Sequence, residues 1–594
     1  METKKRFVNN GKTIKEMLDI MVKNFPGQTA FKVKEEGKIR EVSFFEYFVE
    51  VRKIAAGLAE KGLGGQRIAI IADNSYEYMQ AFMGIVVTGG VAVPLDKGLT
   101  EVELATCLMR SQVKGLFCDK KHRLLALDVL KDFSDVELIV MAGHNAKITE
   151  EEFADEKVAD GTGSTAEACE SKASRAFTIL PTLKALGEAR TQDGSSSYHD
   201  VEIEPENMAV ILFTSGTTAN SKAVMLSHKN IMSNITDMHH FERFYMSDVN
   251  MAFLPLHHSF GLVGVLVFMA CGASNVFCDG LKHIQKNLAE YGVTVFVGVP
   301  LLVENMYKKV WQKAEKEGQA SKLRTGLNLV KLPGFNTTIA KRKIFAKVIE
   351  GLGGSVRLII CGAAPLMPET AAGLNGFGIA TIQGYGLTET SPVLAAERPS
   401  DLMAGSVGKP MPRVRIKIVD KDENGIGEIA AKGPNVMLGY LDQPEETDNV
   451  LRDGWFYTGD LGKIDKHGNL WITGRKKNVI VLKNGKNVFP EEIEGLIEQL
   501  PYVNESLVFT REKYNELVLW VKIVYADEYL KNMGMTEEEL SKKFEEDLAA
   551  INENLPKFKH INHFLITDEP MIMTTTQKVK RNLEIAKIYQ EWKD

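Results

Sequence analysis

The sequence predicts an α/β fold in which helices cover parallel sheets, followed by a β-rich unit and a smaller C-terminal part. A β-α-β rhythm begins at residues 67–72, a strand-like apolar run that ends in a helix N-cap signal, Asp-Asn-Ser, at 73–75. A helical pattern follows over 78–87, and two glycines then lead into a second strand at 91–94. This rhythm is typical of a parallel sheet with helices on its faces.

The same alternation recurs further along the chain. Buried-strand patterns occur at residues 208–213, 293–299 and 357–360, and the apolar run 262–271 is too short to span a bilayer and predicts a buried helix. Between residues 148 and 200 the rhythm weakens into segments rich in Gly, Ser and Thr, which predict exposed loops. A chain of 594 residues has room for roughly four domain-sized units at about 150 residues each.

The character of the sequence changes after about residue 408, where short alternating strands replace the β-α-β rhythm. Residues 414–419 and 427–431 predict a compact β unit. A second break falls at residues 474–478, and β-α-β-like material then continues to the C-terminus. Within it, residues 537–551 predict an acidic amphipathic helix whose charges form a solvated face.

Composition excludes several classes of protein. The net charge of −6, from 72 Lys and Arg against 78 Asp and Glu, argues against nucleic acid as the main partner. The six cysteines form no CxxC pair, which argues against zinc and for reduced thiols. The N-terminus has no apolar region of a secretory signal. We therefore expect a cytoplasmic protein without a transmembrane segment, and peripheral membrane contact stays open.

A phosphate-binding loop is predicted at residues 214–222, Thr-Ser-Gly-Thr-Thr-Ala-Asn-Ser-Lys, between the strand 208–213 and a helix-like stretch. Its hydroxyls, its backbone N–H groups and Lys222 suit a polyanion. The spacing from Gly216 to Lys222 also fits a Walker loop, but Ser221 replaces the second glycine and Ala223 replaces the metal-binding hydroxyl. The Walker alternative therefore fails, whereas a simple polar turn remains an alternative.

Two further segments could admit a flat base. Residues 383–390, Gln-Gly-Tyr-Gly-Leu-Thr-Glu-Thr, place glycines on both sides of Tyr385, so the backbone can approach a ligand and the ring can stack on it. A carboxylate such as Glu389 joins phosphate oxygens in the usual ligand set of Mg²⁺. Residues 362–366, Gly-Ala-Ala-Pro-Leu, follow the strand 357–360 and are small. Either segment alone could be an ordinary turn.

Three shorter motifs complete the set. They are Tyr-Thr-Gly-Asp at 457–460 with Gly-Arg-Lys-Lys at 474–477, Pro-Leu-His-His-Ser-Phe-Gly at 255–261, and Thr-Thr-Thr-Gln-Lys-Val-Lys-Arg at 574–581. A lone Asp after Gly is usually a turn residue, adjacent histidines are more often structural, and a basic C-terminal stretch is commonly exposed. Their order along the chain carries more weight than any one of them.

Taken together, these motifs resemble the adenylate-forming superfamily, which includes acyl-CoA synthetases, luciferases and peptide-synthetase adenylation domains. The loop is similar to the family's T-S-G-T-T-G-x-P-K-G, and the C-terminal motif is similar to T-x-x-G-K-x-x-R. Residues 225–228, 474–490 and 575–581 most resemble bacterial long-chain fatty acid–CoA ligases. The chain departs from the family pattern at four positions: Ala219, Ser221, Ala223 and Gln577.

The resemblance implies a role for each matching residue. The implied nucleotide-binding residues are Thr214, Ser215, Gly216, Thr217, Thr218, Lys222, Gly362, Ala363, Ala364, Gln383, Gly384, Tyr385, Gly386, Asp460 and Arg475. The implied catalytic residues are Lys578, Glu389, Thr388 and His258. Among these, Glu389 would hold Mg²⁺, Lys578 would bridge the acid and the α-phosphate, and His258 would lie near the acid pocket or thiol channel.

The resemblance also implies an order of events. ATP activates a carboxylic acid, expected to be a medium- or long-chain fatty acid, as an acyl-adenylate, and coenzyme A then takes the acyl group. An N-terminal adenylation domain (1–474), a hinge (475–478) at Lys477 and a C-terminal lid (479–594) would rotate between the two steps. An acyl carrier protein is the alternative acceptor. A nucleotide-binding regulator without catalysis is the alternative function, motivated by the departures in the motifs.

Overall fold

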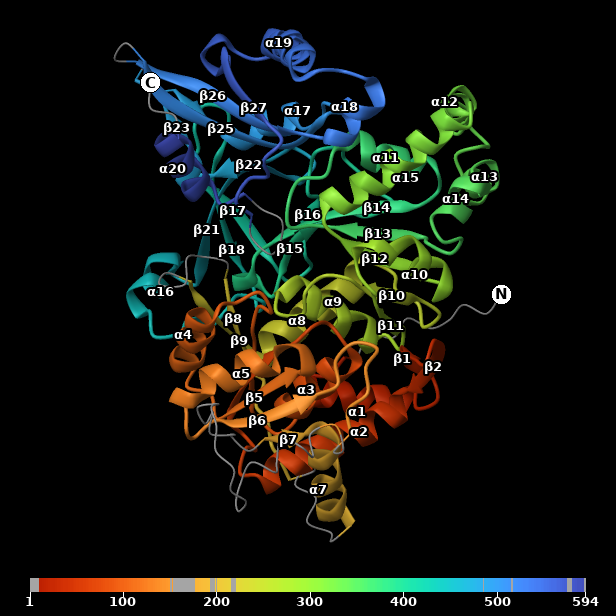
Figure 1. The fold of residues 1–594 in the computed structure, drawn as a ribbon, viewed down its shortest axis with the longest axis vertical. Helices are drawn as coiled ribbons and strands as arrows, with labels where there is room; N and C mark the ends of the chain where they lie inside the picture. Colours follow the sequence, from red (N-terminus) through yellow and green to blue (C-terminus); the bar gives the residue numbers. More distant parts are fainter. Residues whose placement is uncertain are drawn as a thin grey trace, which may run out of the picture. The chain divides into compact units, whose positions relative to one another are not determined.

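The computed structural model describes residues 10–149, 152, 177–192, 198, 200–214, 221–483, 486–513, 516–573 and 579–591. The chain forms two compact units, each described by itself below (Figure 1). Unit 1 comprises Met1–Ala404, Gly408–Arg415 and Lys432–Phe456, and unit 2 comprises Gly405–Val407, Ile416–Ala431 and Tyr457–Asp594. The chain therefore passes between the units several times before it stays in unit 2.

The first sheet of unit 1 has nine strands in the order β16-β15-β14-β13-β12-β10-β11-β1-β2. The strands from β14 to β1 are parallel neighbours, and those at both edges are antiparallel. The central strands are short apolar runs buried on both faces, as a covered parallel sheet requires. The strand bounds are β1 Thr29–Glu35, β2 Lys38–Ser43, β10 Val249–Ala252, β11 Ser274–Phe277, β12 Val295–Gly298, β13 Leu358–Cys361, β14 Ala380–Gly386, β15 Val393–Ala396 and β16 Lys409–Pro410.

The second sheet of unit 1 has eight strands in the order β19-β9-β8-β4-β3-β5-β6-β7. Neighbours from β8 to β7 are parallel, whereas β9 is antiparallel to both β8 and β19. The predicted strands of both sheets are confirmed, with ends that shift by one or two residues. The bounds are β3 Arg67–Ile71, β4 Val91–Pro94, β5 Gly115–Asp119, β6 Glu137–Met141, β7 Thr178–Ile179, β8 Met208–Phe213, β9 Ala223–Ser227 and β19 Gly439–Tyr440.

Helices cover the faces of these sheets, and side-chain caps fix where several of them begin. Ser75 accepts a hydrogen bond from the backbone N of Tyr78 at the start of α3, as its N-cap signal predicted. The predicted buried helix is confirmed as α9, of which most residues are buried. The bounds are α1 Ile14–Asn24, α2 Phe44–Glu60, α3 Tyr76–Val86, α4 Glu101–Ser111, α5 Arg123–Val129, α7 Leu180–Gln192, α8 His228–Phe241, α9 Ser259–Ala270, α10 Ile284–Glu290, α11 Pro300–Lys316, α12 Ala320–Leu329, α13 Thr338–Ile344, α14 Ala346–Gly351, α15 Pro368–Gly376 and α16 Pro444–Val450.

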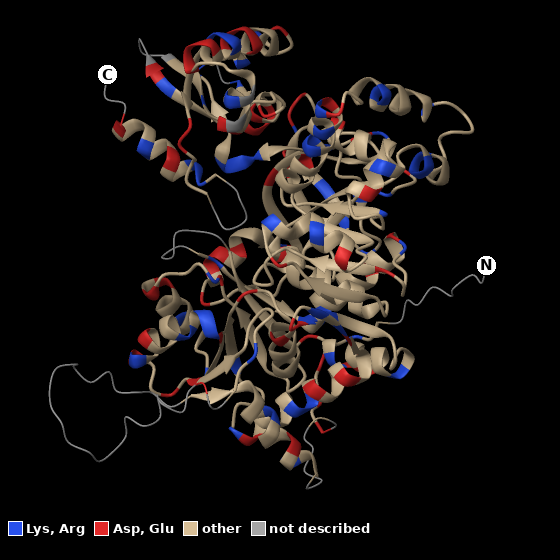
Figure 2. Cartoon of the chain, turned by 45° about the vertical axis from the view of Figure 1, so that its right-hand side comes forward, with Lys and Arg blue, Asp and Glu red and all other residues tan. Residues whose placement is uncertain are grey.

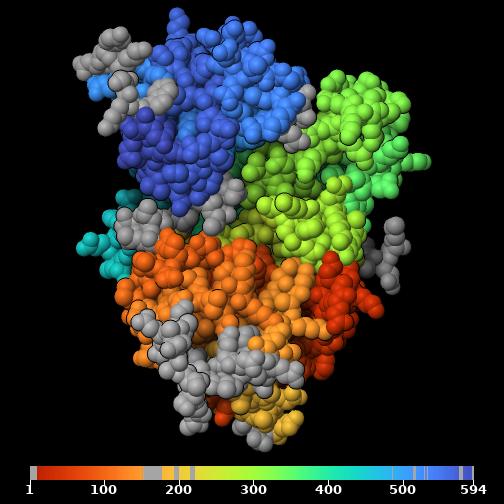
Figure 3. All heavy atoms as spheres, in the orientation of Figure 1, coloured from red at the N-terminus to blue at the C-terminus, as the bar shows by residue number. Residues whose placement is uncertain are grey.

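Charged residues of both signs are distributed along the ribbon of unit 1 (Figure 2), and α12 to α14 lie together at one edge of that unit (Figure 1). The space-filling view shows this edge as an exposed green surface (Figure 3). Within the described part of the chain, no helix is long and apolar enough to cross a bilayer.

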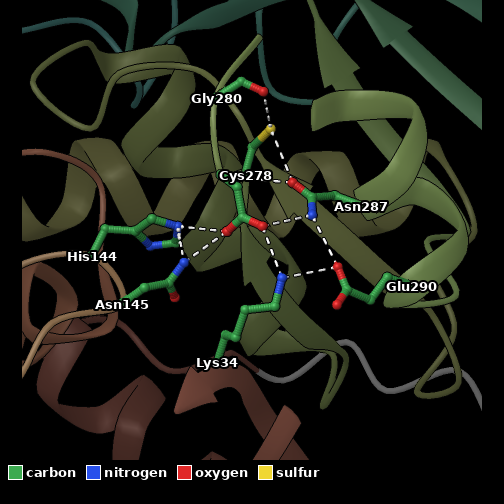
Figure 4. A network of polar contacts seen from close by, with 8 residues as sticks. Lys34, His144, Asn145, Cys278, Gly280, Asn287 and Glu290 are labelled. Carbon is green, nitrogen blue, oxygen red and sulfur yellow. Dashed lines mark hydrogen bonds and ion pairs between the residues drawn. The ribbon is translucent and has the colours of Figure 1, made fainter. Parts of the chain in front are cut away.

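A polar network joins the two sheets of unit 1 at Asp279, just after β11 (Figure 4). Its Oδ2 accepts from Lys34 Nζ at 2.9 Å and from Asn287 Nδ2 at 2.9 Å. Its Oδ1 accepts from Asn145 Nδ2 at 2.7 Å and lies 3.0 Å from His144 Nε2. Lys34 lies on β1 of the nine-stranded sheet, whereas His144 and Asn145 follow β6 of the eight-stranded sheet. The Asp279 carboxylate therefore ties the two sheets together.

A five-stranded sheet has the order β17-β18-β21-β20, with β22 paired to β21. It corresponds to the predicted β unit, because β17 and β18 match residues 414–419 and 427–431 to within one residue. The bounds are β17 Arg415–Val419, β18 Gly427–Lys432, β20 Leu451–Arg452, β21 Trp455–Ile464 and β22 Leu470–Arg475.

The C-terminal part of unit 2 is a three-stranded sheet with helices. β25 and β26 form an antiparallel hairpin, and β27 runs parallel to β26 after the crossover through α18 and α19. Only that crossover has the predicted β-α-β pattern. Helix α19 confirms the predicted amphipathic helix, with Leu540, Phe544 and Leu548 buried. The bounds are β23 Ile480–Val481, β24 Asn487–Val488, α17 Pro490–Ile497, β25 Val503–Lys513, β26 Glu516–Tyr525, α18 Asp527–Met533, α19 Glu537–Glu553, β27 His563–Thr567 and α20 Arg581–Glu591.

Candidate functional site

The predicted phosphate loop connects two antiparallel strands, β8 and β9. The helix expected directly after it is wrong, because β9 follows the loop and pairs antiparallel with β8. Ala223, Val224 and Leu226 are buried, and a helix-capping signal comes only at Ser227, whose side chain caps α8 together with Asn230. The described chain after the loop is therefore a strand, and a helix begins only at His228.

Thr214 and Lys222 close the base of this loop. The backbone N of Thr214 donates to the carbonyl O of Lys222 at 2.9 Å, and the backbone N of Lys222 donates to Oγ1 of Thr214 at 3.3 Å. The carbonyl O of Ser221 accepts from Arg110 Nη1 at 2.7 Å, which fixes the loop to α4. Four predicted phosphate ligands lie outside the described residues, and their roles stay predictions: Ser215, Gly216, Thr217 and Thr218.

Lys222 lies directly before β9, and its side chain contacts Tyr440 on β19, the strand that pairs with β9. Its Nζ lies 2.8 Å from Glu446 Oε2 and 4.5 Å from the centroid of the Tyr440 ring. Residues Gly439 and Tyr440 of β19 stand opposite Met225 and Val224 of β9, so this contact follows from strand register. The ion pair is half-exposed, and a pair of this kind is worth at most about 1 kcal/mol. A phosphate group could therefore displace Glu446.

Tyr440 links Lys222 to Glu389. Its hydroxyl donates to Glu389 Oε1 at 2.9 Å, while the backbone carbonyl of Glu389 accepts from Met437 N at 2.8 Å. Burial and the adjacent Glu389 carboxylate raise the pKa of Tyr440 well above its usual value, so the phenol stays protonated and donates at any physiological pH. A line of polar contacts thus runs from Glu446 through Lys222 and Tyr440 to Glu389. We call these four residues the β9–β19 chain.

The two segments predicted to admit a base lie side by side. Cys361 and Gln383 are partners in the β13–β14 register, and Gln383 Oε1 accepts from the backbone N of Leu366 at 2.9 Å. A Cβ on Gly362 would lie 3.3 Å from the carbonyl O of Gly384, which explains why glycine stands there. The structure therefore brings these two motifs together as the sequence predicts.

The backbone is strained within the first of these segments. Ala363 has φ of 75°, a left-handed conformation that costs a non-glycine residue about 1 kcal/mol or more. Ala363 and Ala364 are exposed, Tyr385 is half-buried on β14, and Gly386 ends that strand. Strain of this kind concentrates at functional sites, where surrounding structure maintains it. Here the strained segment is held by the β13–β14 pairing and by the hydrogen bond from the backbone N of Leu366 to Gln383.

The predicted histidine pair lies in the segment between β10 and α9. His258 is the N-cap of α9, its ring centroid is 4.3 Å from that of His257, and His257 Nε2 lies 3.6 Å from Asp96 Oδ2. Burial, and then the neighbouring His258, lower the pKa of His257 to about 3, so it is neutral at physiological pH. A Cβ on Gly362 would lie 3.1 Å from Phe260, so the start of α9 adjoins the base segment.

Asn74, which the sequence marked only as part of a helix cap, orients the histidine loop. Its Nδ2 donates to the carbonyl O of Leu254 at 2.8 Å, and its Oδ1 accepts from the backbone N of Leu256 at 3.0 Å. These two bonds hold the segment just before His257 against the end of β3. A half-buried amide that satisfies two backbone groups restricts the conformation of the loop.

In unit 2, the predicted pair of Asp460 and Arg475 is in contact. The two residues are register partners on β21 and β22, and Arg475 Nε donates to Asp460 Oδ1 at 3.0 Å. Asp460 is buried, whereas Arg475 and the predicted hinge residue Lys477 are exposed. Lys578 and Gln577 lie outside the described residues, so the role of Lys578 stays a prediction.

Three residues of the site were missed by sequence reasoning: Tyr440, Glu446 and Asn74. Tyr440 is 51 residues from Glu389, and nothing in their local patterns links them. The one signal was Gly439-Tyr440 after a stretch of short strands, which could have predicted an edge strand pairing with the strand after the phosphate loop.

The residues present fit Mg²⁺ held jointly with a nucleotide. Among the described residues, no group of three or more His, Cys, Asp or Glu could hold a metal alone. Glu389 has one carboxylate oxygen oriented by Tyr440, and among the described residues its other oxygen makes no hydrogen bond. One protein carboxylate together with substrate phosphates is a usual ligand set for Mg²⁺. Glu389 and Thr388, on the 3₁₀ turn Thr388–Thr390, would then face the phosphates together.

The fold and these motifs define the class of the protein. Residues 18–441 match the family model of the AMP-binding enzyme, and residues 477–593 match that of the AMP-binding enzyme C-terminal domain. The chain therefore belongs to the AMP-binding enzyme family, and the predicted resemblance to adenylate-forming enzymes is confirmed.

The chain is also similar to individual members of this family. The chain is 25% identical to fatty acyl-CoA synthetase B of Dictyostelium discoideum, over 93% of this chain and 85% of that one. It is 29% identical to long-chain-fatty-acid–CoA ligase 5 of Rattus norvegicus, over 88% and 79%. Among solved structures it is similar to ATP-bound MatB from Rhodopseudomonas palustris, with a TM-score of 0.72 and 25% identity over 98% of this chain and all of that one.

Proposed function

We propose that this chain is an acid–thiol ligase that uses ATP to convert a medium- or long-chain fatty acid to its acyl-adenylate and then to its coenzyme A thioester. The observation that carries the proposal is the β9–β19 chain, in which the lysine of a phosphate loop and a carboxylate suited to Mg²⁺ meet on Tyr440. The choice of a fatty acid is supported by the names of the relatives.

In the first half-reaction, an oxygen of the substrate carboxylate attacks the α-phosphorus of ATP, and the bond from that phosphorus to pyrophosphate breaks. Both reactants are anionic, so the protein contributes chiefly positioning and positive charge. Lys222 exchanges Glu446 for phosphate oxygens, and Lys578 bridges the acid and the α-phosphate. Glu389 would hold Mg²⁺, which when bound would offset phosphate charge, and Tyr440 keeps that carboxylate oriented.

The family resemblance assigns the contacts to the nucleoside. The ring of Tyr385 stacks on adenine, and the small residues Gly362 to Ala364 leave room for it. Asp460 accepts hydrogen bonds from the ribose hydroxyls, and its ion pair with Arg475 keeps the carboxylate in place. These roles rest on the family resemblance and on the contacts described above.

In the second half-reaction, the sulfur of coenzyme A attacks the acyl carbon, the bond from that carbon to the AMP oxygen breaks, and the thiol proton is released to solvent. No protein nucleophile is required. We assign the adenylation domain to residues 1–474, the hinge to 475–478 with Lys477, and the lid to 479–594. The exposed 3₁₀ turn Lys476–Asn478 supports the hinge, where rotation would replace Lys578 with a thiol-binding face.

The test is release of pyrophosphate from ATP and Mg²⁺ across a panel of aliphatic and aryl acids, with coenzyme A, with a phosphopantetheine-loaded carrier protein, or with neither. We expect release with aliphatic acids and turnover with coenzyme A. Turnover with the carrier alone would identify it as the acceptor. ATP binding without release on any acid would favour the nucleotide-binding regulator and overturn the proposal.

Lys578→Ala separates the two half-reactions. It should depress adenylation strongly and spare thiol transfer from a supplied acyl-adenylate, whereas equal loss in both would contradict the assigned role. We place the reaction in the cytoplasm, supported by the described cysteines, all of which are unpaired thiols.

A further inference from the structure

The strongest segregation of charge in the molecule lies between β12 and β13. Residues 308–347, named here the basic segment, contain eleven Lys and Arg against two Glu, a net charge of +9. The remaining 554 residues have a net charge of −15. Helices α12 and α13 and parts of α11 and α14 belong to this segment, whose ribbon includes several Lys and Arg positions coloured blue in Figure 2.

The charges of the basic segment are not neutralised by ion pairs in the described part of the chain. Within the described chain, none of the eleven forms an ion pair, although lysines elsewhere in unit 1 commonly do. Arg342 donates to the carbonyls of Val356 and Gly354, and Arg324 lies 5.7 Å from the centroid of the Trp311 ring. The other cations are lysines, and those at positions 331 and 343 are fully at the surface. Their charge is therefore available to an external partner.

Large apolar side chains stand exposed among these cations. Residues 331–339 are exposed without interruption and include Leu332, Phe335 and Ile339, of which Ile339 is 84% exposed. Leu323 and Phe345, by contrast, are buried and fasten the segment to the apolar core beneath it. Exposed apolar residues that gather in one stretch usually mark a contact with another apolar surface.

We propose that the basic segment docks on the surface of an anionic phospholipid bilayer. Lysines interleaved with exposed apolar side chains are the pattern that suits such a surface, because the cations meet lipid headgroups while the apolar side chains enter the acyl boundary. Nucleic acid fits less well. Nine of the eleven cations are Lys, and the planar guanidinium that reads phosphates in pairs is scarce here.

The docking segment is connected to the base pocket of the proposed function. Helix α11 begins where β12 ends, and Glu304 on it accepts from the backbone N of Met367 at 3.1 Å. Met367 follows directly on Leu366, which is bound to Gln383 of β14. A fatty acid dissolves in the same bilayer that the segment would contact, so docking would place the enzyme at the source of its proposed substrate.

The test is co-sedimentation of the full chain with vesicles of phosphatidylcholine alone and of phosphatidylcholine mixed with phosphatidylglycerol. We expect binding to the mixed vesicles, weakened by added salt. Lys331→Glu with Lys343→Glu should lower the partition coefficient by about tenfold or more. Phe335→Ser with Ile339→Ser should lower it at all salt concentrations, because the apolar contribution is not screened.

Matched controls come from exposed residues elsewhere. Lys23→Glu with Lys38→Glu makes the same change in net charge, and Val102→Ser with Leu124→Ser removes similar exposed apolar surface. Both pairs should bind vesicles as the parent does, and thermal unfolding checks that every variant folds. Equal binding to both vesicle types, unchanged binding of the basic-segment variants, or equal loss in the controls would overturn the proposal. So would binding to duplex DNA in place of vesicles. No outcome depends on pyrophosphate release, so the proposed function is tested separately.

Discussion

Two polar networks in unit 1 contain similar groups and differ in how they end. The network at Asp279 closes on itself, because both carboxylate oxygens are engaged and Lys34 also reaches Glu290 at 3.0 Å (Figure 4). The β9–β19 chain is open: it ends in Glu446 on one side and in a half-exposed Glu389 on the other.

The difference teaches how to separate structural charge from functional charge. Partial burial acts to raise the pKa of Asp279, but its four hydrogen-bond donors outweigh burial and hold that pKa well below the usual range. Such a carboxylate is fully used by the protein. In the β9–β19 chain, an exposed ion pair is easily exchanged for a ligand. We infer that the closed network holds the two sheets together and that the open chain does chemistry.

The largest effect should follow from Glu389→Gln. The amide keeps the hydrogen bond from Tyr440 but loses the negative charge that holds Mg²⁺, so adenylation should fall by about a thousandfold. Thermal unfolding should be nearly unchanged because the side chain is half-exposed. Pyrophosphate release measures the first quantity, and calorimetry measures the second. A wild-type rate would remove Glu389 from the site.

Asp279→Asn should produce the opposite pattern. It leaves Lys34 with only Glu290 and should lower the free energy of unfolding by about 2 kcal/mol, with little change in the activity of the folded enzyme. Urea unfolding is the measurement. A loss of activity without a loss of stability would contradict the structural role.

The pH dependence sharpens that prediction. The folded pKa of Asp279 lies below its unfolded value of about 3.9, so its stabilisation is present above that pH and is lost as the pH falls towards the folded pKa. The difference in stability between the parent and Asp279→Asn should therefore be constant near neutral pH and shrink below about pH 4. A difference that grows on acidification would contradict the assigned ion pair.

Tyr440→Phe tests the link within the open chain. Removing the hydroxyl leaves Glu389 in place but unoriented, and such changes next to a metal ligand typically cost about tenfold in metal affinity or activity. Activity should therefore require a higher Mg²⁺ concentration, and saturating Mg²⁺ should restore part of the rate. A Mg²⁺ titration that superimposes on that of the parent would show that Tyr440 does not position Glu389.

Glu446→Gln should have the smallest effect. It releases Lys222 from a surface ion pair worth at most about 1 kcal/mol, so KM for ATP should fall by about twofold at unchanged kcat. The expected effect should vanish at high salt, where the pair is already screened. A rise in KM would mean that Glu446 helps to hold Lys222 for the phosphates.

The sequence predicted the local parts of this structure well. Strands such as β8 were recognisable as short apolar runs, and the start of α3 followed from its Ser75 cap, since both signals lie within a few residues. The contact of the segment 362–366 with β14 was also predictable, because consecutive parallel strands bring their carboxyl ends together.

The long-range contacts could not be predicted. Lys34 and Asp279 are 245 residues apart, and Tyr440 reaches Glu389 only because β19 joins the edge of a sheet built from much earlier strands. The sequence predicts the start of a helix where β9 lies, because a run of five residues carries too little periodicity to distinguish a strand from a helix. Sequence motifs predicted Lys222 and Glu389, whereas Tyr440, which joins them, could be found only from the sheet topology.

Exchange of labelled pyrophosphate into ATP, with a long-chain fatty acid and without any thiol, tests the central claim most directly. It reports formation of the acyl-adenylate alone and compares both networks in one assay. The account predicts exchange by the parent and by Asp279→Asn below its unfolding temperature, and almost none by Glu389→Gln. Exchange by Glu389→Gln at the parental rate, or its loss in folded Asp279→Asn, would contradict the assignment of chemistry to the open chain.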